Sequence, residues 1–331
     1  MNSEKKFDKN APRFLGSHIV FDRGTGGITG TCPCGEFMEV YKVDKTFRVY
    51  TPESLDPEVI DPNMRSVVTD TADIGTGNEI VARILIQTRE FLDSNLLPST
   101  IDKEAIICCF HECKELLIEC DVIAKKVSTE VHEIISKIDS NKLSVDSGGR
   151  ALNPFPQVKE LEDNSSKFLV NTKRFIQKLA EVFNVFYHTD FQGPWFNKIK
   201  SWARENLGVD SPVYKTVAMC EPNFKHIVDM RNFHEHPVKN KKTVIENFRL
   251  LPHSKVQPPV WYITGEPKTS IAKDMINYVS SFLESAEILF IRCMLDNIKE
   301  CPFCVVEIPE NEREKDCPVK YKWSIHQRSL K

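Results

Sequence analysis

The most concentrated chemistry in this sequence lies between Arg231 and Pro237. Arg231 carries a planar guanidinium whose fixed fork of donors matches the oxygens of a phosphate. His236 carries an imidazole, the side chain that ordinarily exchanges a proton near neutral pH. An arginine suited to phosphate and a histidine suited to proton transfer, five residues apart, make this stretch a candidate functional site.

Pro237 determines where these two side chains can lie. A residue that precedes proline is disfavoured in the α conformation, so His236 is predicted to end a helix. The negative end of that helix would favour the imidazolium form of His236. On a regular helix, five residues at about 100° each place Arg231 and His236 about 140° apart. The two side chains can therefore meet only at the helix end, or with the help of a second subunit.

The residues around this stretch carry a local positive charge. Between positions 213 and 242 there are six lysines or arginines and three acidic residues, which gives a net charge of +3. Lys239, Lys241 and Lys242 directly follow the Arg–His stretch and are predicted to contact neighbouring phosphates of a nucleic acid. A solvated loop without a binding role is the alternative for the same three lysines.

The eleven cysteines form a second source of chemistry. In a reducing compartment they would be core thiols, metal ligands or nucleophiles rather than a disulfide framework. Two pairs stand in tight turns near the chain ends, and zinc prefers four such ligands in a tetrahedron. The spacing predicts a structural zinc ion with two alternative ligand sets: Cys301 and Cys304 with Cys32 and Cys34, or Cys301 and Cys304 with Cys317 and His326. Reduced surface thiols are the alternative to both sets.

The elements that must position these residues are mostly helices. Apolar residues recur at spacings of three and four and predict helices near 78–97, 106–138, 164–187, 195–207, 212–236 and 269–297. The helix over 212–236 is predicted to be interrupted, or to begin anew, at Pro222. The segments 244–251 and 259–264 are predicted to pair as a β-hairpin.

These elements predict a mainly α fold: a helical bundle with a small strand-rich N-terminal lobe and a β-hairpin insertion. The lobe is expected over 1–75, where glycines and short β-type runs alternate. The helical region is expected over 76–300, with a linker near 145–158, and a cysteine-containing tail follows over 301–331.

Length and composition exclude several classes of protein. The chain has 331 residues, of which 27% are charged and 41% hydrophobic, so it is neither disordered nor membrane-like. Its first residues are polar with no apolar segment behind them, which favours a cytoplasmic protein with no membrane partner. The net charge of −3 excludes a globally basic nucleic-acid coat. Any nucleic-acid site must be a local patch.

The sequence Arg231-Asn232-x-x-x-His236, at the end of a predicted helix, resembles the RNxxxH form of the motif of the HEPN superfamily. Many HEPN proteins are metal-independent ribonucleases of toxin–antitoxin, abortive-infection and CRISPR systems; others are inactive bundles that bind RNA or a partner protein. The resemblance covers the six motif residues, and the helical region over 78–297 is compatible with the family fold. The first seventy residues and the cysteine-containing tail have no counterpart in the minimal family domain.

The resemblance implies an RNA endonuclease that needs no cofactor for catalysis. Arg231 would stabilise the charge that builds up on the scissile phosphate. His236 would move a proton, as base on the 2′-OH or as acid on the 5′-oxygen, and Asn232 would orient one of the two. The products would be a 2′,3′-cyclic phosphate and a 5′-OH.

The family also implies partners. Two motifs usually meet across a dimer interface, so a homodimer is expected, and a toxin or anti-phage effector of this type would be paired with an antitoxin or a nucleotidyltransferase. Two other functions stay open: a non-catalytic HEPN-like bundle that binds RNA, a nucleotide or a protein, and a zinc-stapled helical scaffold in which Arg231 and His236 are structural.

Overall fold

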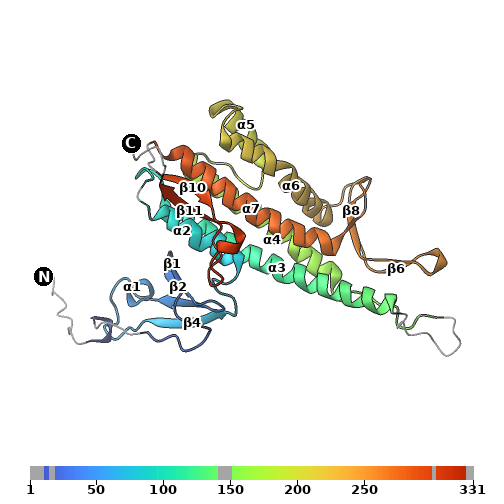
Figure 1. The fold of residues 1–331 in the computed structure, drawn as a ribbon, viewed down its shortest axis with the longest axis horizontal. Helices are drawn as coiled ribbons and strands as arrows, with labels where there is room; N and C mark the ends of the chain where they lie inside the picture. The colour runs from blue at the N-terminus through green and yellow to red at the C-terminus, as the bar shows by residue number, and fades with distance from the viewer. Residues whose placement is uncertain (1–10, 15–18, 95, 141–150, 300–302, 326–331) are drawn as a thin grey trace. The chain divides into compact units, whose positions relative to one another are not determined.

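The computed structural model describes residues 11–14, 19–94, 96–140, 151–299 and 303–325 (Figure 1). The fold is mainly α, with seven α-helices and several small antiparallel sheets among the described residues. Contacts between residues are denser within each of two compact units of the chain than between them. The first unit takes residues up to 111 together with those from 297 onward, and the second takes residues 112–296.

The first unit contains a four-stranded antiparallel sheet in the order β1-β2-β3-β4. Its strands are β1 (Gly30–Cys34), β2 (Phe37–Tyr41), β3 (Thr46–Tyr50) and β4 (Val67–Ala72), and a short helix α1 (Pro52–Leu55) follows β3. The register pairs Cys32 with Glu39 and Glu39 with Arg48. Because directly paired residues share a face, these polar side chains lie together, and the opposite face carries an apolar cluster of Val40, Phe47 and Val49.

Two later segments complete the first unit. The π-helix η2 (Val81–Ile86) runs directly into α2 (Gln87–Leu92), and β10 (Phe303–Glu307) pairs antiparallel with β11 (Tyr321–Ile325). The Gln87 Oε1 atom accepts hydrogen bonds of 2.7 Å from the backbone N–H groups of Lys320 and Tyr321. The rings of Phe91 and Trp323 are nearly perpendicular, with centroids 5.1 Å apart. These contacts join α2 to the C-terminal hairpin, so the observed units differ from the predicted boundaries at 75 and 300.

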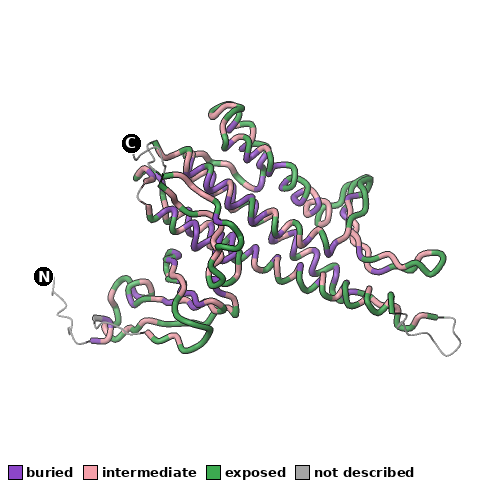
Figure 2. The backbone as a smooth tube through the Cα atoms, in the orientation of Figure 1, coloured by how far each residue is buried: buried purple, intermediate pink, exposed green. Residues whose placement is uncertain are grey.

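The second unit is built from helices that share an aromatic core. Its helices are α4 (Leu161–Tyr187), α5 (Phe196–Asn206), α6 (Pro212–Glu235), α7 (Ile271–Asn297) and the part of α3 (Lys103–Asp139) that follows residue 111. Phe175 of α4 stacks on Phe282 of α7, and Phe224 of α6 packs between Phe282 and Phe196 of α5. Figure 2 shows the buried stripes along these helices.

Helix α6 is continuous, and the predicted interruption at Pro222 is wrong. The ring of Pro222 lies on the exposed side of the helix, while Phe224 is buried between aromatic rings of two neighbouring helices. Proline removes one backbone donor from a helix, and the packing of Phe224 offsets that loss. The helix begins with Ser211, whose hydroxyl accepts a hydrogen bond from the N–H of Val213.

The predicted hairpin after α6 is present as β5 (Thr243–Glu246) paired with β8 (Val260–Ile263), and β9 (Thr269–Ser270) adds a third short strand. Strands β6 (Arg249–Leu250) and β7 (Val256–Gln257) extend the excursion between β5 and β8. The Thr243 hydroxyl donates a hydrogen bond of 2.6 Å to the carbonyl of Met230, which ties β5 to the last turns of α6. Within the described residues, no helix combines the length and the apolar character that a membrane span requires.

Candidate functional site

The Arg–His stretch lies at the C-terminal end of α6. The helix ends at Glu235, and His236 follows it with a non-helical backbone (φ −129°, ψ 69°). The N–H of His236 still donates a hydrogen bond of 2.8 Å to the carbonyl of Asn232. The prediction that His236 ends the helix is confirmed, and Pro237 supplies the reason.

One carboxylate oxygen of Glu235 lies close to both predicted catalytic side chains, Arg231 and His236. Its Oε2 atom forms an ion pair with Nη2 of Arg231, four residues earlier on the helix. The same oxygen lies 3.9 Å from Nε2 of His236. The side chain of His236 is 77% exposed and that of Arg231 is 20% exposed. Within one chain, a single anionic oxygen is therefore close to both groups, even though the regular helix would place them on different faces.

Lys173 of α4 extends the site. Its Nζ donates a hydrogen bond of 3.1 Å to Oδ1 of Asn232, the second residue of the predicted motif. Burial lowers the pKa of Lys173, and the positive charge of Arg231 lowers it further, while the Glu235 carboxylate opposes both effects. Arg231 and Lys173 are thus close enough to repel each other, which is the electrostatic setting of an anion-binding site. Sequence reasoning missed Lys173 because it lies 59 residues before Asn232.

Not every donor of the Arg231 guanidinium has a hydrogen-bond acceptor among the described residues. Its Nε is buried and has no hydrogen-bond partner among the described residues. A buried donor without an acceptor costs free energy, and such groups are often found where function requires them.

The three predicted RNA-binding lysines lie in the exposed segment after the helix end. Val238 and Lys241 exchange backbone hydrogen bonds across a tight turn. This turn places the Nζ of Lys241 over the ring of Phe233 at 5.6 Å, beside the last turn of α6. Lys239 and Lys242 flank it, so a basic segment directly follows the Arg–His stretch in the chain.

The predicted zinc ligands have separate outcomes. Cys301, which both predicted ligand sets include, lies outside the described residues, as does His326. The Sγ of Cys304 donates to the carbonyl of Ser324 across the β10–β11 pair at 3.6 Å. Burial raises the pKa of Cys317 to about 12. In the described part of the chain, the cluster of potential metal ligands contains neither Cys304 nor Cys317.

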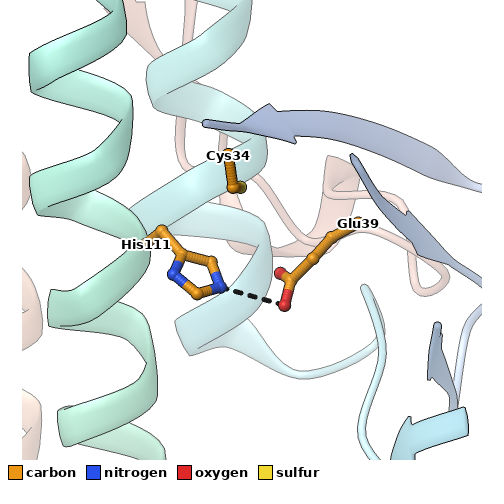
Figure 3. A group of neighbouring side chains, drawn as sticks. All are labelled: Cys34, Glu39 and His111. Atoms are coloured by element: carbon orange, nitrogen blue, oxygen red, sulfur yellow. Dashed lines mark hydrogen bonds and ion pairs between the residues drawn. The ribbon is translucent and has the colours of Figure 1, made fainter. Parts of the chain in front are cut away.

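That cluster instead joins Cys34 to two residues that sequence reasoning missed, Glu39 and His111. Figure 3 shows the three side chains pointing toward one another from β1, β2 and α3. One ligand atom of each lies within 4.8 Å of the other two, and Nε2 of His111 is 2.9 Å from Oε1 of Glu39. Cys34 is 6% exposed, and the side chains of Glu39 and His111 are 0% and 12% exposed.

The Glu39 carboxylate also accepts hydrogen bonds from Arg48 and Tyr41. Nε of Arg48 donates to Oε1 at 3.1 Å, and the hydroxyl of Tyr41 donates to Oε2. Burial and the neighbouring Glu39 raise the pKa of Tyr41 well above its usual range, so the hydroxyl stays protonated. A sequence signal for Glu39 existed: in a hairpin that turns after Cys34, strand alternation places residue 39 on the face of Cys32 and Cys34.

Comparison with known proteins finds no matching family model, no matching curated protein and no matching solved structure.

Proposed function

We propose that this chain is a HEPN-like, metal-independent RNA endonuclease in which Arg231 and His236 act on the scissile phosphate. The observation that carries the proposal is the Glu235 oxygen that lies beside both side chains. A phosphate oxygen is an anionic acceptor of the same kind as a carboxylate oxygen. We infer that a phosphate oxygen of bound RNA takes the place of Oε2 and contacts both groups.

The proposed reaction is an internal transesterification. The 2′-oxygen forms a bond to phosphorus, the bond from phosphorus to the 5′-oxygen breaks, and the products end in a 2′,3′-cyclic phosphate and a 5′-OH. Arg231 stabilises the charge that develops on the non-bridging oxygens. His236 takes the proton of the 2′-OH or gives a proton to the leaving 5′-oxygen. In the proposed homodimer, the second copy of the motif supplies the other proton transfer.

The residues around this pair have supporting roles in the proposal. Asn232, held by Lys173, keeps the last turn of α6 in place beside the cationic groups. Lys239, Lys241 and Lys242 contact phosphates on either side of the cleaved one. Glu235 occupies the phosphate position in the free protein and is displaced when RNA binds. In this proposal the helical second unit is the HEPN-like bundle. The protein acts in the cytoplasm as a toxin or an anti-phage effector, and an antitoxin or nucleotidyltransferase partner restrains it.

The experiment compares four proteins on total RNA in the presence of EDTA: wild type, Arg231→Ala, His236→Ala and His226→Ala. His226 is the matched control because it is an exposed histidine of the same helix with a carboxylate partner, Glu266, at 3.7 Å. Cleavage by wild type and by His226→Ala, with loss in the other two variants, supports the proposal. End mapping must find 2′,3′-cyclic phosphates. Cleavage that requires Mg²⁺, or that survives in His236→Ala, contradicts it.

A second candidate function is a non-catalytic HEPN-like module that binds RNA or a partner protein. The observation that favours it is the Arg231–Glu235 ion pair, which neutralises the arginine in the free chain. This function predicts RNA binding in a filter or anisotropy assay with no cleavage by the wild-type protein. Loss of binding on Arg231→Ala would then identify the same site as a binding surface.

A further inference from the structure

We propose that Cys34, Glu39 and His111 bind one Zn²⁺ ion inside the first unit, and that Cys32 supplies the fourth ligand. This ligand set differs from both sets expected from cysteine spacing, because it includes a carboxylate and a helix histidine and excludes Cys301 and Cys304. The site is independent of Arg231 and His236 and has a structural role.

The donor atoms are the ones that zinc selects. Zinc in proteins is bound by cysteine sulfur, histidine nitrogen and carboxylate oxygen, usually in a tetrahedron. Zinc–ligand bonds of about 2.0–2.3 Å place such ligands about 3.5 Å apart. The three donor atoms already lie within 4.8 Å of one another. Small side-chain rotations therefore close the cluster around an ion without moving the strands or the helix.

The fold brings these donors together at a buried position. The β1–β2 register places Cys32, Cys34 and Glu39 on one face of the sheet. His111 reaches the same point from α3, and its ring packs edge-on against Phe37 at 5.4 Å. Nε2 of His111 contacts the Glu39 carboxylate, and Sγ of Cys34 donates a hydrogen bond of 3.5 Å to the carbonyl of Cys32. These are separate contacts, yet all three side chains point toward one another (Figure 3). A metal ion accounts for all three.

The surroundings resemble the outer shell of a metal site. Carboxylate ligands are commonly oriented by further hydrogen bonds. Here Tyr41 donates to Oε2 of Glu39, which leaves Oε1 turned toward the imidazole and the thiol. The charge of Arg48 at Oε1 offsets part of the negative charge that two thiolates and a carboxylate bring to a buried zinc ion.

The fourth ligand follows from the same register. Cys32 is fully buried, is paired directly with Glu39 and lies two residues before Cys34 on the same face of β1. Its Sγ is not one of the clustered ligand atoms and donates to the carbonyl of Pro33 at 3.8 Å, so its side chain must rotate to reach the ion. Cysteine binds zinc as the thiolate and histidine as the neutral imidazole, so metal binding releases protons.

The test measures zinc in the full chain, purified after expression with added zinc, by mass spectrometry of the metal. The variants are Cys34→Ser, Glu39→Gln and His111→Gln, and the matched control is Cys304→Ser, a cysteine of the same unit outside the cluster. The proposal predicts one zinc per chain in wild type and in the control, and at least tenfold less zinc per chain in each of the three variants. A zinc-free wild type overturns the proposal. So does a metal content that depends on Cys304 and is unaffected by His111→Gln.

A fourth variant keeps the test decisive if the others fold poorly. His111→Cys retains a zinc ligand but cannot make the histidine–carboxylate hydrogen bond. The proposal predicts that this variant still binds zinc, and that its Co²⁺-substituted form has stronger sulfur-to-cobalt absorption than wild type. If the cluster is only a hydrogen-bonded network, the variant binds neither metal, and the wild type gives no thiolate–cobalt band. RNA cleavage is not a readout in either experiment, so failure here leaves the proposed nuclease untouched.

Discussion

Two sites in this molecule place a glutamate against a histidine, and they differ in almost every other respect. Glu235 meets His236 at an exposed helix end, within a stretch of six consecutive residues. Glu39 meets His111 in a buried cluster that joins two strands and a helix across 72 residues of sequence. The first site is open to a large, flexible substrate. The second is closed to anything much larger than a metal ion.

The same difference determines how firmly each carboxylate is held. An ion pair near the surface contributes about 0–1 kcal/mol, so a phosphate can displace Glu235 from Arg231 at little cost. The buried Glu39 accepts hydrogen bonds from Arg48, Tyr41 and His111. Replacing it removes the acceptor of three buried or half-buried hydrogen bonds. Local sequence thus builds an exchangeable site, and long-range packing builds a fixed one.

The largest expected effect is on catalysis at the exposed site. His236→Ala should lower the rate of RNA cleavage by about 10²–10⁴-fold, the usual contribution of a general acid or base. The thermal unfolding midpoint should not change, because the side chain is 77% exposed. Single-turnover cleavage and a thermal unfolding curve on the same preparation check both parts. A comparable loss of stability would mean that His236 supports the fold.

The next largest effect is on stability, where replacing Glu39 should cost more than replacing Glu235. Glu39→Ala should lower the free energy of unfolding by about 3–5 kcal/mol, because it removes one member of a buried ion pair. Glu235→Ala, the matched change at the exposed site, should cost less than about 1 kcal/mol. Urea unfolding of both variants in zinc-free buffer measures the difference. Equal losses would contradict the contrast between the two sites.

Much of the exposed site could be predicted from the sequence because its geometry is local. Pro237 ends the helix at His236 whatever the rest of the chain does. Apolar periodicity predicted helices α3 to α7 for a similar reason, since a helix brings together residues only three or four positions apart. The prediction failed at Pro222, where the burial of Phe224 against α5 and α7 outweighs a local helix-breaking preference.

The complete buried cluster could not be predicted, because strand alternation could relate Glu39 to Cys34 but no short pattern relates either residue to His111. Glu39 joins Cys34 only after the β1–β2 register is set, since a shift by one residue would turn its side chain to the other face. His111 reaches them from α3, 72 residues after Glu39 in the sequence. In the same way, the hydrogen bonds of Gln87 to Lys320 and Tyr321, more than 230 residues away, join the C-terminal hairpin to α2.

Removing the charge of Glu235 should increase the affinity of the exposed site for RNA. Glu235→Gln leaves Arg231 without its anionic partner, so the affinity for single-stranded RNA should rise about 3–10-fold, equivalent to about 0.7–1.4 kcal/mol. Fluorescence anisotropy in a His236→Ala background avoids cleavage during the titration. Weaker binding would show that Glu235 positions Arg231 instead of competing with RNA for it.

The lysines after the helix should act through charge alone. Lys239→Gln, Lys241→Gln and Lys242→Gln should each weaken RNA binding at low salt and should reduce the slope of log affinity against log salt by about 0.7–0.9. Lys215→Gln serves as the control, because Lys215 lies on the first turns of the same helix, far from the Arg–His stretch in sequence. An unchanged slope in all three variants would mean that the segment is a solvated loop.

The smallest expected effect is a pH dependence carried by Lys173. Burial and the charge of Arg231 lower its pKa, so the folded chain releases this proton at a lower pH than the unfolded chain does. The free energy of unfolding should therefore rise with pH between the two pKa values. RNA affinity should fall over the same interval, since the site then loses one positive charge. Lys173→Arg keeps that charge and should abolish the alkaline loss of affinity, whereas Lys167→Arg, at an exposed lysine of the same helix, should not. An identical pH profile in wild type and Lys173→Arg would place Lys173 outside the RNA-binding site and restrict it to orienting Asn232.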